Sequence, residues 1–351
     1  MPPDTTQALT ASRYPGSPAS LRRPSAPRWR NWAVAVGTQG LRAGGLILFL
    51  AVLGGFAIAA PAFLTPANLG LILAQSAVLG ILSLGLTLVL ITGGSDVVGG
   101  GIDLSLAGTL GLSAATFANL NQAGYGDGAC VAAALAIGVT VGLMNAVAVV
   151  RLRILPLLAT LAVMNICEGL ELVVTENTTV AAASPLLDGL GQTGPFGVPV
   201  LGYVLLAVTL ALGLASRRTT LGLRAYAVGG HPEAARAAGI VPERYVAASY
   251  VLSGGLGGLG GIVSVAFLNS ATGGSADMLL PVVATAFLGF IFSRRLVPTV
   301  TGTLLAAVFL GSLSNGFQLL RLSTYWVNGI EGALILAVVG ATAGLSKGRR
   351  A

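Results

Sequence analysis

The sequence predicts an all-α, polytopic membrane protein with about ten transmembrane helices and both termini in the cytoplasm. Three observations predict this fold class. The chain of 351 residues is 54% hydrophobic, only 9% charged and contains 50 glycines, with a mean hydropathy of +0.86. These values lie far outside the range of soluble globular domains. In addition, apolar segments recur at the length of ~20 residues that a helix needs to cross a bilayer, and basic residues lie between them in an uneven pattern.

Residues 1–42 precede the first apolar segment and are predicted to form a disordered, basic cytoplasmic tail. They are rich in Pro, Ser, Thr and Arg and show no apolar period, which is typical of segments that cannot bury a core. A cleavable signal peptide is not expected, because the first long apolar run begins only after this tail.

Residues 43–345 are predicted to form one membrane domain, and residues 346–351 a short cytoplasmic tail. Ten apolar segments of roughly spanning length follow one another in this domain. They cover residues 44–63, 69–91, 102–119, 128–150, 155–174, 198–215, 246–269, 278–293, 299–319 and 325–344.

The basic residues predict the orientation of these spans. Of the 19 Lys and Arg residues, only Arg321 falls in a loop that ten spans with both ends inside would place outside. Such a bias is the expected signature of cytoplasmic loops. The inner loops carry Arg151, Arg153, Arg217, Arg218, Arg224, Arg236, Arg244, Arg294 and Arg295, and the C-terminal tail carries Lys347, Arg349 and Arg350. The net charge of +7 therefore indicates topology and not a nucleic-acid partner.

The cytoplasmic loop 216–245 contains a charged island that predicts a short helix outside the membrane. Pro232 suits the first helical position, Glu233 suits the positive end of the helix dipole, and Gly239 is a natural C-terminal stop. Arg236 is expected to pair with Glu233 one turn earlier. Because a helix of about seven residues is not stable alone in water, another protein is expected to hold it.

Several kinds of chemistry are missing from the sequence. The only lysine, Lys347, lies between Ser346 and Gly348, so there is no phosphate-binding loop of the G-x-x-x-x-G-K-[ST] type and ATP would have to be hydrolysed by a second polypeptide. The sole histidine, His231, lies in the cytoplasmic loop, and no G-x-S-x-G motif is present. No metal site is indicated. The chain is therefore not expected to be an enzyme.

Acidic residues inside spans are costly and are functional candidates by default. Asp103, at the start of the third span, either lines a pathway or caps the following helix, and the sequence favours neither. Glu168 lies midway along the fifth span and is the costliest of the set, while Glu331 lies in the tenth span. Glu171 is expected to reach water at the outer surface.

Uncharged polar residues inside spans and clustered glycines have simpler interpretations. Asn165, Asn315 and Gln318 are expected to form hydrogen bonds between helices, with Asn315 also a candidate pathway residue. Gly254 with Gly258, and Gly257 with Gly261, have the small-xxx-small spacing that lets helices approach closely. Packing is the preferred interpretation of these glycines, and a flexible gate is the alternative.

Four motifs stand out in the chain from residue 44 onward. They are Ile91-Thr-Gly-Gly94 with Gly101-Ile-Asp-Leu-Ser105, Ala159-Thr-Leu-Ala-Val-Met164 with Gly169-Leu170, Ala227-Val-Gly-Gly-His-Pro-Glu-Ala-Ala-Arg-Ala-Ala-Gly-Ile240, and Gly302-Thr-Leu-Leu305 with Leu313-Ser-Asn-Gly-Phe-Gln-Leu-Leu320 and Tyr325-Trp326. Residues Ser95 to Gly101 interrupt the first motif, and the third motif is the most specific. Together the motifs resemble one known family, the ten-span permeases of ABC importers for monosaccharides of the ribose, xylose and arabinose type, and the resemblance covers nearly all of the chain from residue 44 onward.

The resemblance implies a homodimeric permease in the bacterial inner membrane, working by alternating access. Its partners would be two cytoplasmic ATPase subunits, which bind ATP and Mg, and an extracytoplasmic solute-binding protein; membrane lipid surrounds it. The implied ATPase-coupling residues are Gly230, Pro232, Glu233, Ala234, Ala235 and Gly239, and the candidate pathway or gate residues are Asp103, Ser105, Glu168, Asn315 and Glu331.

A second function remains open from the sequence, an ion-coupled secondary transporter in which Asp103, Glu168 and Glu331 would bind protons or sodium ions. The coupling-like loop argues against it. A membrane enzyme is a third and weaker alternative, because the motifs for it are missing.

Overall fold

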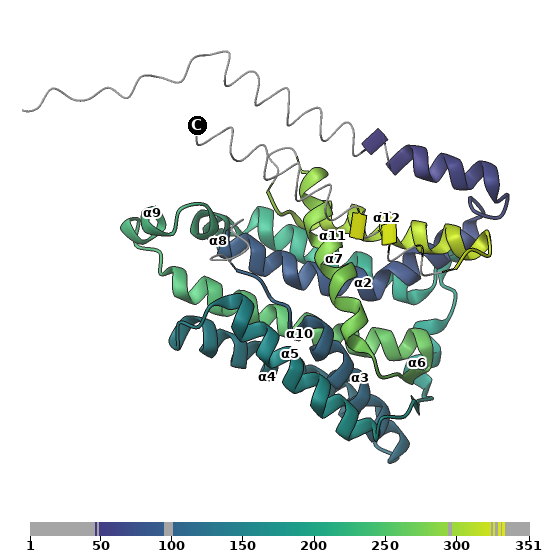
Figure 1. Cartoon of the computed structure of the whole chain (residues 1–351), viewed down its shortest axis with the longest axis horizontal. Helices are drawn as coiled ribbons and strands as arrows, with labels where there is room; N and C mark the ends of the chain where they lie inside the picture. Colours follow the sequence, from purple (N-terminus) through teal and green to yellow (C-terminus); the bar gives the residue numbers. More distant parts are fainter. Residues whose placement is uncertain are drawn as a thin grey trace, which may run out of the picture.

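The computed structural model describes residues 46–47, 49–94, 101–293, 297–323, 326, 329–330 and 332–333. In these residues the chain is almost wholly helical (Figure 1). In chain order, the elements after the first helix at Phe49–Ala59 are α2 (Pro66–Gly93), α3 (Leu106–Gln122), α4 (Asp127–Ala146), the π-helix η1 (Val147–Arg151), α5 (Pro156–Thr175), β1 (Val180–Ala181), α6 (Pro185–Gly191), the short 3-10 helix η2 (Pro195–Gly197), α7 (Val200–Arg218), α8 (Thr220–Gly230), α9 (Pro232–Ala237), α10 (Pro242–Leu268), β2 (Ser270–Ala271), the 3-10 helix η3 (Ser275–Met278), α11 (Leu279–Ile291) and α12 (Val300–Leu319).

Nine of the ten predicted spans contain a helix in the described residues, but only six helices there are long and apolar enough to cross a membrane. These are α2, α4 continued by η1, α5, α7, α10 and α12. The helix at Phe49–Ala59 and the segment Ser275–Ile291 are apolar but shorter, and α3 has 17 residues. The tail 1–42, the tail 346–351 and the pair Arg294 and Arg295 lie outside the described residues, and of the tenth predicted span only residues 326, 329–330 and 332–333 are described.

The central helix of the bundle is α2, which packs against α7, α10, α11 and α12 (Figure 1). Its core-facing side chains include Ile81, Leu82 and Leu84, which are fully buried. On the other side of α10 lie α3, α4 and α5. At one end of the bundle, β1 and β2 form a short antiparallel pair in which Val180 lies opposite Ala271.

The glycines of α10 are packing residues, as predicted. A Cβ at Gly254 would overlap the carbonyl oxygen of Gly138 in α4, and a Cβ at Gly258 would lie 2.7 Å from the carbonyl oxygen of Ala134. A Cβ at Gly261 would lie 2.8 Å from the carbonyl oxygen of Leu110 in α3. Thus two faces of one helix approach two neighbouring backbones closely, which is how helices associate where lipid gives no hydrophobic drive.

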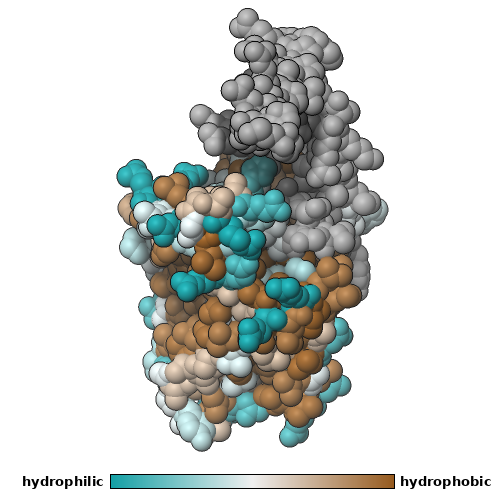
Figure 2. Space-filling model, turned by 90° about the vertical axis from the view of Figure 1, so that its left-hand side faces the viewer, coloured by the Kyte–Doolittle hydropathy of each residue, from teal (hydrophilic) through white to brown (hydrophobic). Residues whose placement is uncertain are grey.

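The basic residues of the described loops gather at the end of the molecule that carries α8 and α9 (Figure 1). Both α7 and η1 end there in arginines, and Val149 of η1 and Val246 at the start of α10 pack against the same buried cluster around Tyr250. Figure 2 looks onto this end and shows hydrophilic residues set among hydrophobic ones. Arg321 follows α12 at the opposite end. The separation of charge predicted from the sequence is therefore present in the described residues.

Candidate functional site

The loop between α7 and α10 folds as two helices, α8 and α9, where the sequence predicted one. The hydroxyl of Thr219 caps α8 by accepting a hydrogen bond of 3.2 Å from the backbone N–H of Gly222. A threonine before a helix is a standard N-terminal signal, so α8 could have been found from the sequence. Its eleven residues connect the end of α7 to α9.

The end of α9 confirms the predicted stop at Gly239. This glycine has a φ of +80°, its N–H donates to the carbonyl of Arg236 at 3.0 Å, and the N–H of Ile240 donates to the carbonyl of Ala235 at 3.0 Å. Together these bonds form a Schellman motif, in which glycine takes the left-handed position at no steric cost. The predicted pair between Arg236 and Glu233 is wrong, because Arg236 pairs with Glu243 at the start of α10.

The six candidate coupling residues divide into an outward and an inward set. Ala235 is 5% exposed and faces the contact of α9 with α8 and α10. The outward set, all exposed, is Gly230, Pro232, Glu233, Ala234 and Gly239. Sequence reasoning treated Ala234 and Ala235 alike, because rotation of a one-and-a-half-turn helix about its axis is not readable from so short a pattern.

The helix α8 joins the bundle by a backbone contact with α2. A Cβ at Gly229 would overlap the carbonyl oxygen of Ile91, and a Cβ at Gly94, whose φ is +78°, would lie 2.9 Å from the carbonyl oxygen of Gly229. Only glycine permits this approach. Beside it, Val228 is fully enclosed, with 2% of its surface exposed. The C-terminal end of α8 is therefore fixed to the end of α2.

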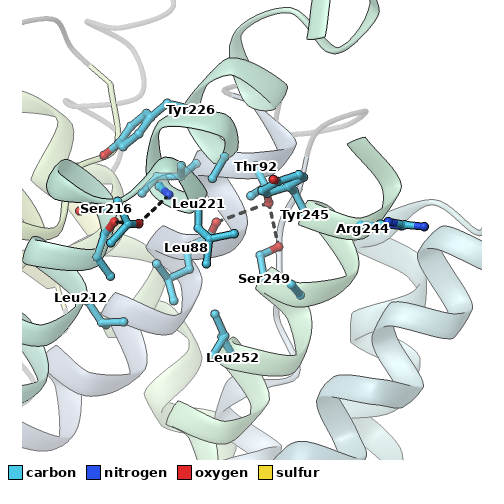
Figure 3. Close-up of a pocket in the computed structure, with 16 residues that line it drawn as sticks. Leu88, Thr92, Leu212, Ser216, Leu221, Tyr226, Arg244, Tyr245, Ser249 and Leu252 are labelled. Carbon is cyan, nitrogen blue, oxygen red and sulfur yellow. Dashed lines mark hydrogen bonds between the residues drawn. The ribbon is translucent and has the colours of Figure 1, made fainter. Parts of the chain in front are cut away.

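The other end of α8 lies over a cavity of about 460 Å³ (Figure 3). Leu88 of α2, Leu212 of α7, Leu221 of α8 and Leu252 of α10 line it. Its few polar groups are satisfied within the wall; for example, the hydroxyls of Thr92 and Ser249 are 2.7 Å apart. The N-terminal half of α8 thus lies over an apolar space, and it packs on the end of α7 through Gly222, where a Cβ would overlap the backbone of Ser216.

Asp103 lies in the extended turn before α3 and is almost fully buried, with 1% of its surface exposed. Its carboxylate accepts hydrogen bonds from the N–H and hydroxyl of Ser105, at 3.1 and 2.6 Å, and from the hydroxyl of Ser253 in α10, at 2.7 Å. The side-chain amide of Asn145 in α4 donates to the Ser105 hydroxyl at 2.7 Å. These groups join the turn to α4 and α10, so in this structure Asp103 neither opens into a cavity nor caps α3 directly.

This network predicts a stability effect. Asp103→Ala should destabilise the protein by about 3 kcal/mol or more, because three donors that are buried together lose their acceptor and each unsatisfied group costs roughly 1–3 kcal/mol. Asp103→Asn should cost less, since its amide oxygen can still accept from Ser105. Thermal unfolding of the detergent-solubilised protein measures both, with the exposed Asp277→Ala as the control. Equal unfolding temperatures for Asp103→Ala and the parent would refute this role.

The structure reverses the predicted environments of the two glutamates of α5. Glu171 is buried, with 2% of its surface exposed, and accepts a hydrogen bond from the hydroxyl of Ser275. It lies against Gly111 of α3, where no Cβ blocks it. The expectation that water satisfies Glu171 is therefore wrong. Glu168 is half-buried, and one of its carboxyl oxygens is buried without a hydrogen-bond partner among the described residues, as is one carboxyl oxygen of Glu171.

The remaining candidates serve packing or lie elsewhere. Asn315 of α12 accepts a hydrogen bond of 2.9 Å from Asn68 of α2, which confirms the interhelical alternative. Gln318 accepts one of 3.2 Å from Gln75. Asn165 is exposed and donates only to its own helix, at the carbonyl of Leu161, so its predicted interhelical bond is not formed. Glu331 and residues 95–100 lie outside the described residues.

Comparison with known proteins shows the family. A model of the family described as the branched-chain amino acid transport system / permease component matches residues 68–339. The chain belongs to this permease family. The match includes the turn around Asp103 and the whole of α8, α9 and α10.

Individual relatives refine the assignment. The permease is 34% identical to the ribose import permease protein RbsC of Escherichia coli (strain K12) over 84% of this chain and 91% of that protein. It is 32% identical to the autoinducer 2 import system permease protein LsrC of Enterobacter sp. (strain 638), over 84% of this chain and 85% of that protein. It is 26% identical to the L-arabinose ABC transporter permease protein AraH of Azospirillum brasilense, over 95% of each chain. No solved structure matches it significantly.

These findings confirm the resemblance to the monosaccharide permeases. The chain is an ABC importer permease subunit and a multi-pass protein of the bacterial inner membrane. Six helices of the described part are long and apolar enough to cross the membrane. Nothing in the comparisons supports the ion-coupled alternative.

Proposed function

We propose that this permease imports a monosaccharide, or a similar small polar solute, by alternating access driven by ATP hydrolysis on a separate subunit. The observation that carries the proposal is α9, a helix of six residues that stands at the basic end of the bundle with small side chains turned outward. So short a helix gains from a partner surface. The relatives that import ribose and L-arabinose support the choice of solute.

The proposed assembly is a permease homodimer with two cytoplasmic ATPase subunits and an extracytoplasmic binding protein. ATP and Mg would bind to the ATPase alone. The outward set of coupling residues would enter a groove on the ATPase, with Ala234 making the closest approach and Ala235 holding α9 to its own chain. Ten spans with both termini inside complete the proposal, and it rests on the distribution of Lys and Arg residues along the sequence.

The translocation pathway is proposed to run along the outer side of α5. Asn165 is exposed on this side, and the half-buried Glu168 lies one turn further along α5. Polar groups facing hydrocarbon are costly, and a water-filled path between two copies of the permease removes that cost. Glu331 keeps the pathway role that the sequence suggests. Asp103 and Ser105 would not line this path. They would instead hold the turn before α3 in place.

Uptake into proteoliposomes tests the function. We expect uptake of labelled ribose or L-arabinose when the permease is reconstituted with its ATPase and binding protein and ATP is supplied on the ATPase side. Omitting ATP should reduce uptake to background, because the permease hydrolyses nothing itself. A branched-chain amino acid serves as the comparison solute. Uptake by the permease alone on a sodium or proton gradient would contradict the proposal and favour a carrier.

A further inference from the structure

A second cavity, of about 480 Å³, lies on the side of α7 away from the cavity in Figure 3, where α7 passes α12. Leucines form its apolar wall: Leu206, Leu210 and Leu214 from α7 and Leu304 from α12. The leucines of α7 are between 39% and 63% exposed. In the membrane this groove therefore faces hydrocarbon and is open to it.

The groove has the length of one bilayer leaflet. Leu206 and Arg217 are eleven residues apart in one helix, which corresponds to about 16 Å at a rise of about 1.5 Å per residue. The hydrocarbon core of a bilayer is about 30 Å thick. An acyl chain that starts at the arginine end would thus follow the leucines to about the middle of the membrane.

The end of the groove near α8 is positively charged. Arg217 and Arg218 line it, and a guanidinium nitrogen of Arg217 donates to the hydroxyl of Thr301 at 2.7 Å. This bond uses one of the five N–H groups of the guanidinium and holds it across the groove. Within the described part of the chain the single ion pair is Arg236 with Glu243, so neither groove arginine is neutralised there. The N-terminal turn of α12, which begins at Val300, adds its positive dipole end.

The cavity in Figure 3 lacks this arrangement. It is also apolar, but Arg244, the one arginine that lines it, points away from its interior (Figure 3). A hydrocarbon chain could enter that cavity, but a bound anion would not meet a pair of cations there. Of these two cavities, only the groove between α7 and α12 combines a pair of arginines with an apolar wall.

We propose that this groove binds an anionic phospholipid of the cytoplasmic leaflet. One acyl chain lies along Leu206, Leu210 and Leu214, and the phosphate lies between Arg217 and Arg218. Arginine suits this role because its planar donors match phosphate oxygens in pairs. The site rests on the proposed function only in that the α8 end of the bundle is cytoplasmic.

Native mass spectrometry of the detergent-solubilised permease tests the site. We add phosphatidylglycerol or phosphatidylcholine at equal concentration and count the bound lipids. The parent should retain phosphatidylglycerol about 30-fold more strongly, as expected for two arginines near a membrane surface. The double variant Arg217→Gln, Arg218→Gln should lose this preference, whereas Arg224→Gln, on the exposed surface of α8, should keep it.

A second variant tests the apolar part. Leu210→Trp fills the groove without touching the charge, so it should reduce retention of both lipids by a similar factor. Unchanged phosphatidylglycerol binding in the arginine double variant, or equal loss in Arg224→Gln, would overturn the site. The measurement uses neither ATP nor solute, so its outcome is independent of the uptake experiment. The lipid preference can be absent while uptake succeeds, and uptake can be absent while the lipid binds.

Discussion

Ala234→Asp should abolish ATP-driven uptake while the permease still inserts and folds. Ala234 is exposed on α9, outside the membrane helices, so the change disturbs no contact within the chain. A charged side chain there would prevent close approach to a partner groove and would bring an unpaired charge into the contact. We expect co-purifying ATPase to fall by at least about tenfold, which is the scale of a hot-spot loss. Affinity purification of the tagged permease and uptake into proteoliposomes measure both effects.

Two further variants make this test specific. Ala276→Asp introduces the same charge at an exposed position in η3, at the opposite end of the bundle, and should leave ATPase binding unchanged. Gly239→Pro should reproduce the loss, because proline cannot adopt the φ of +80° that ends α9. If Ala234→Asp bound the ATPase and transported at the parental rate, α9 would not be the coupling helix.

Gly254→Ala should strongly destabilise the membrane domain. The new methyl group would overlap the carbonyl oxygen of Gly138 and lie 2.7 Å from the Cα of Gly142. Since both obstacles are backbone, α4 and α10 would have to move apart. Overpacking of this kind costs about 1–3 kcal/mol. The unfolding temperature of the solubilised protein should fall accordingly.

The neighbouring glycine gives a matched control for this prediction. A Cβ at Gly255 would lie 3.8 Å from its nearest neighbour, a methyl of Val139, which is ordinary contact. Gly255→Ala should therefore be neutral or slightly stabilising, because alanine favours a helix over glycine by roughly 1 kcal/mol. The two adjacent variants should thus differ in the sign or size of their effect. Equal unfolding temperatures would show that the contact between α4 and α10 is not tight.

The sequence predicted the helices well because each follows from local composition. The bounds of α2, α5, α10 and α12 fall within about four residues of the predicted spans, since long apolar runs end at polar or proline residues. The same composition does not reveal neighbours. The spacing of Gly254 and Gly258 predicted a close contact, but the partner was identified only when the structure placed Gly138 and Gly142 opposite them.

Candidate site residues were harder to predict, because their role depends on the direction in which a side chain points. Glu168 and Glu171 are one turn apart, yet one is half-buried and the other enclosed, as decided by the packing of α3 on one side of α5. In the same way, Ala234 and Ala235 are adjacent in sequence but face opposite surroundings. The depth of a residue along a span can be estimated from the sequence. The direction in which its side chain points around the helix axis can be known only when the positions of the neighbouring helices are known.

The contact of Gly229 with Ile91 links the helix pair α8 and α9 to α2. Helix α8 is fixed to α2 at one end and lies over a cavity at the other. A displacement of α9 can therefore be passed through α8 to α2. Helix α2 is the most enclosed of the six long apolar helices in the described residues, and it contacts α7, α10, α11 and α12. A displacement of α9 would therefore reach two long helices of the bundle, α2 through the Gly229 contact and α10 through the pair of Arg236 with Glu243.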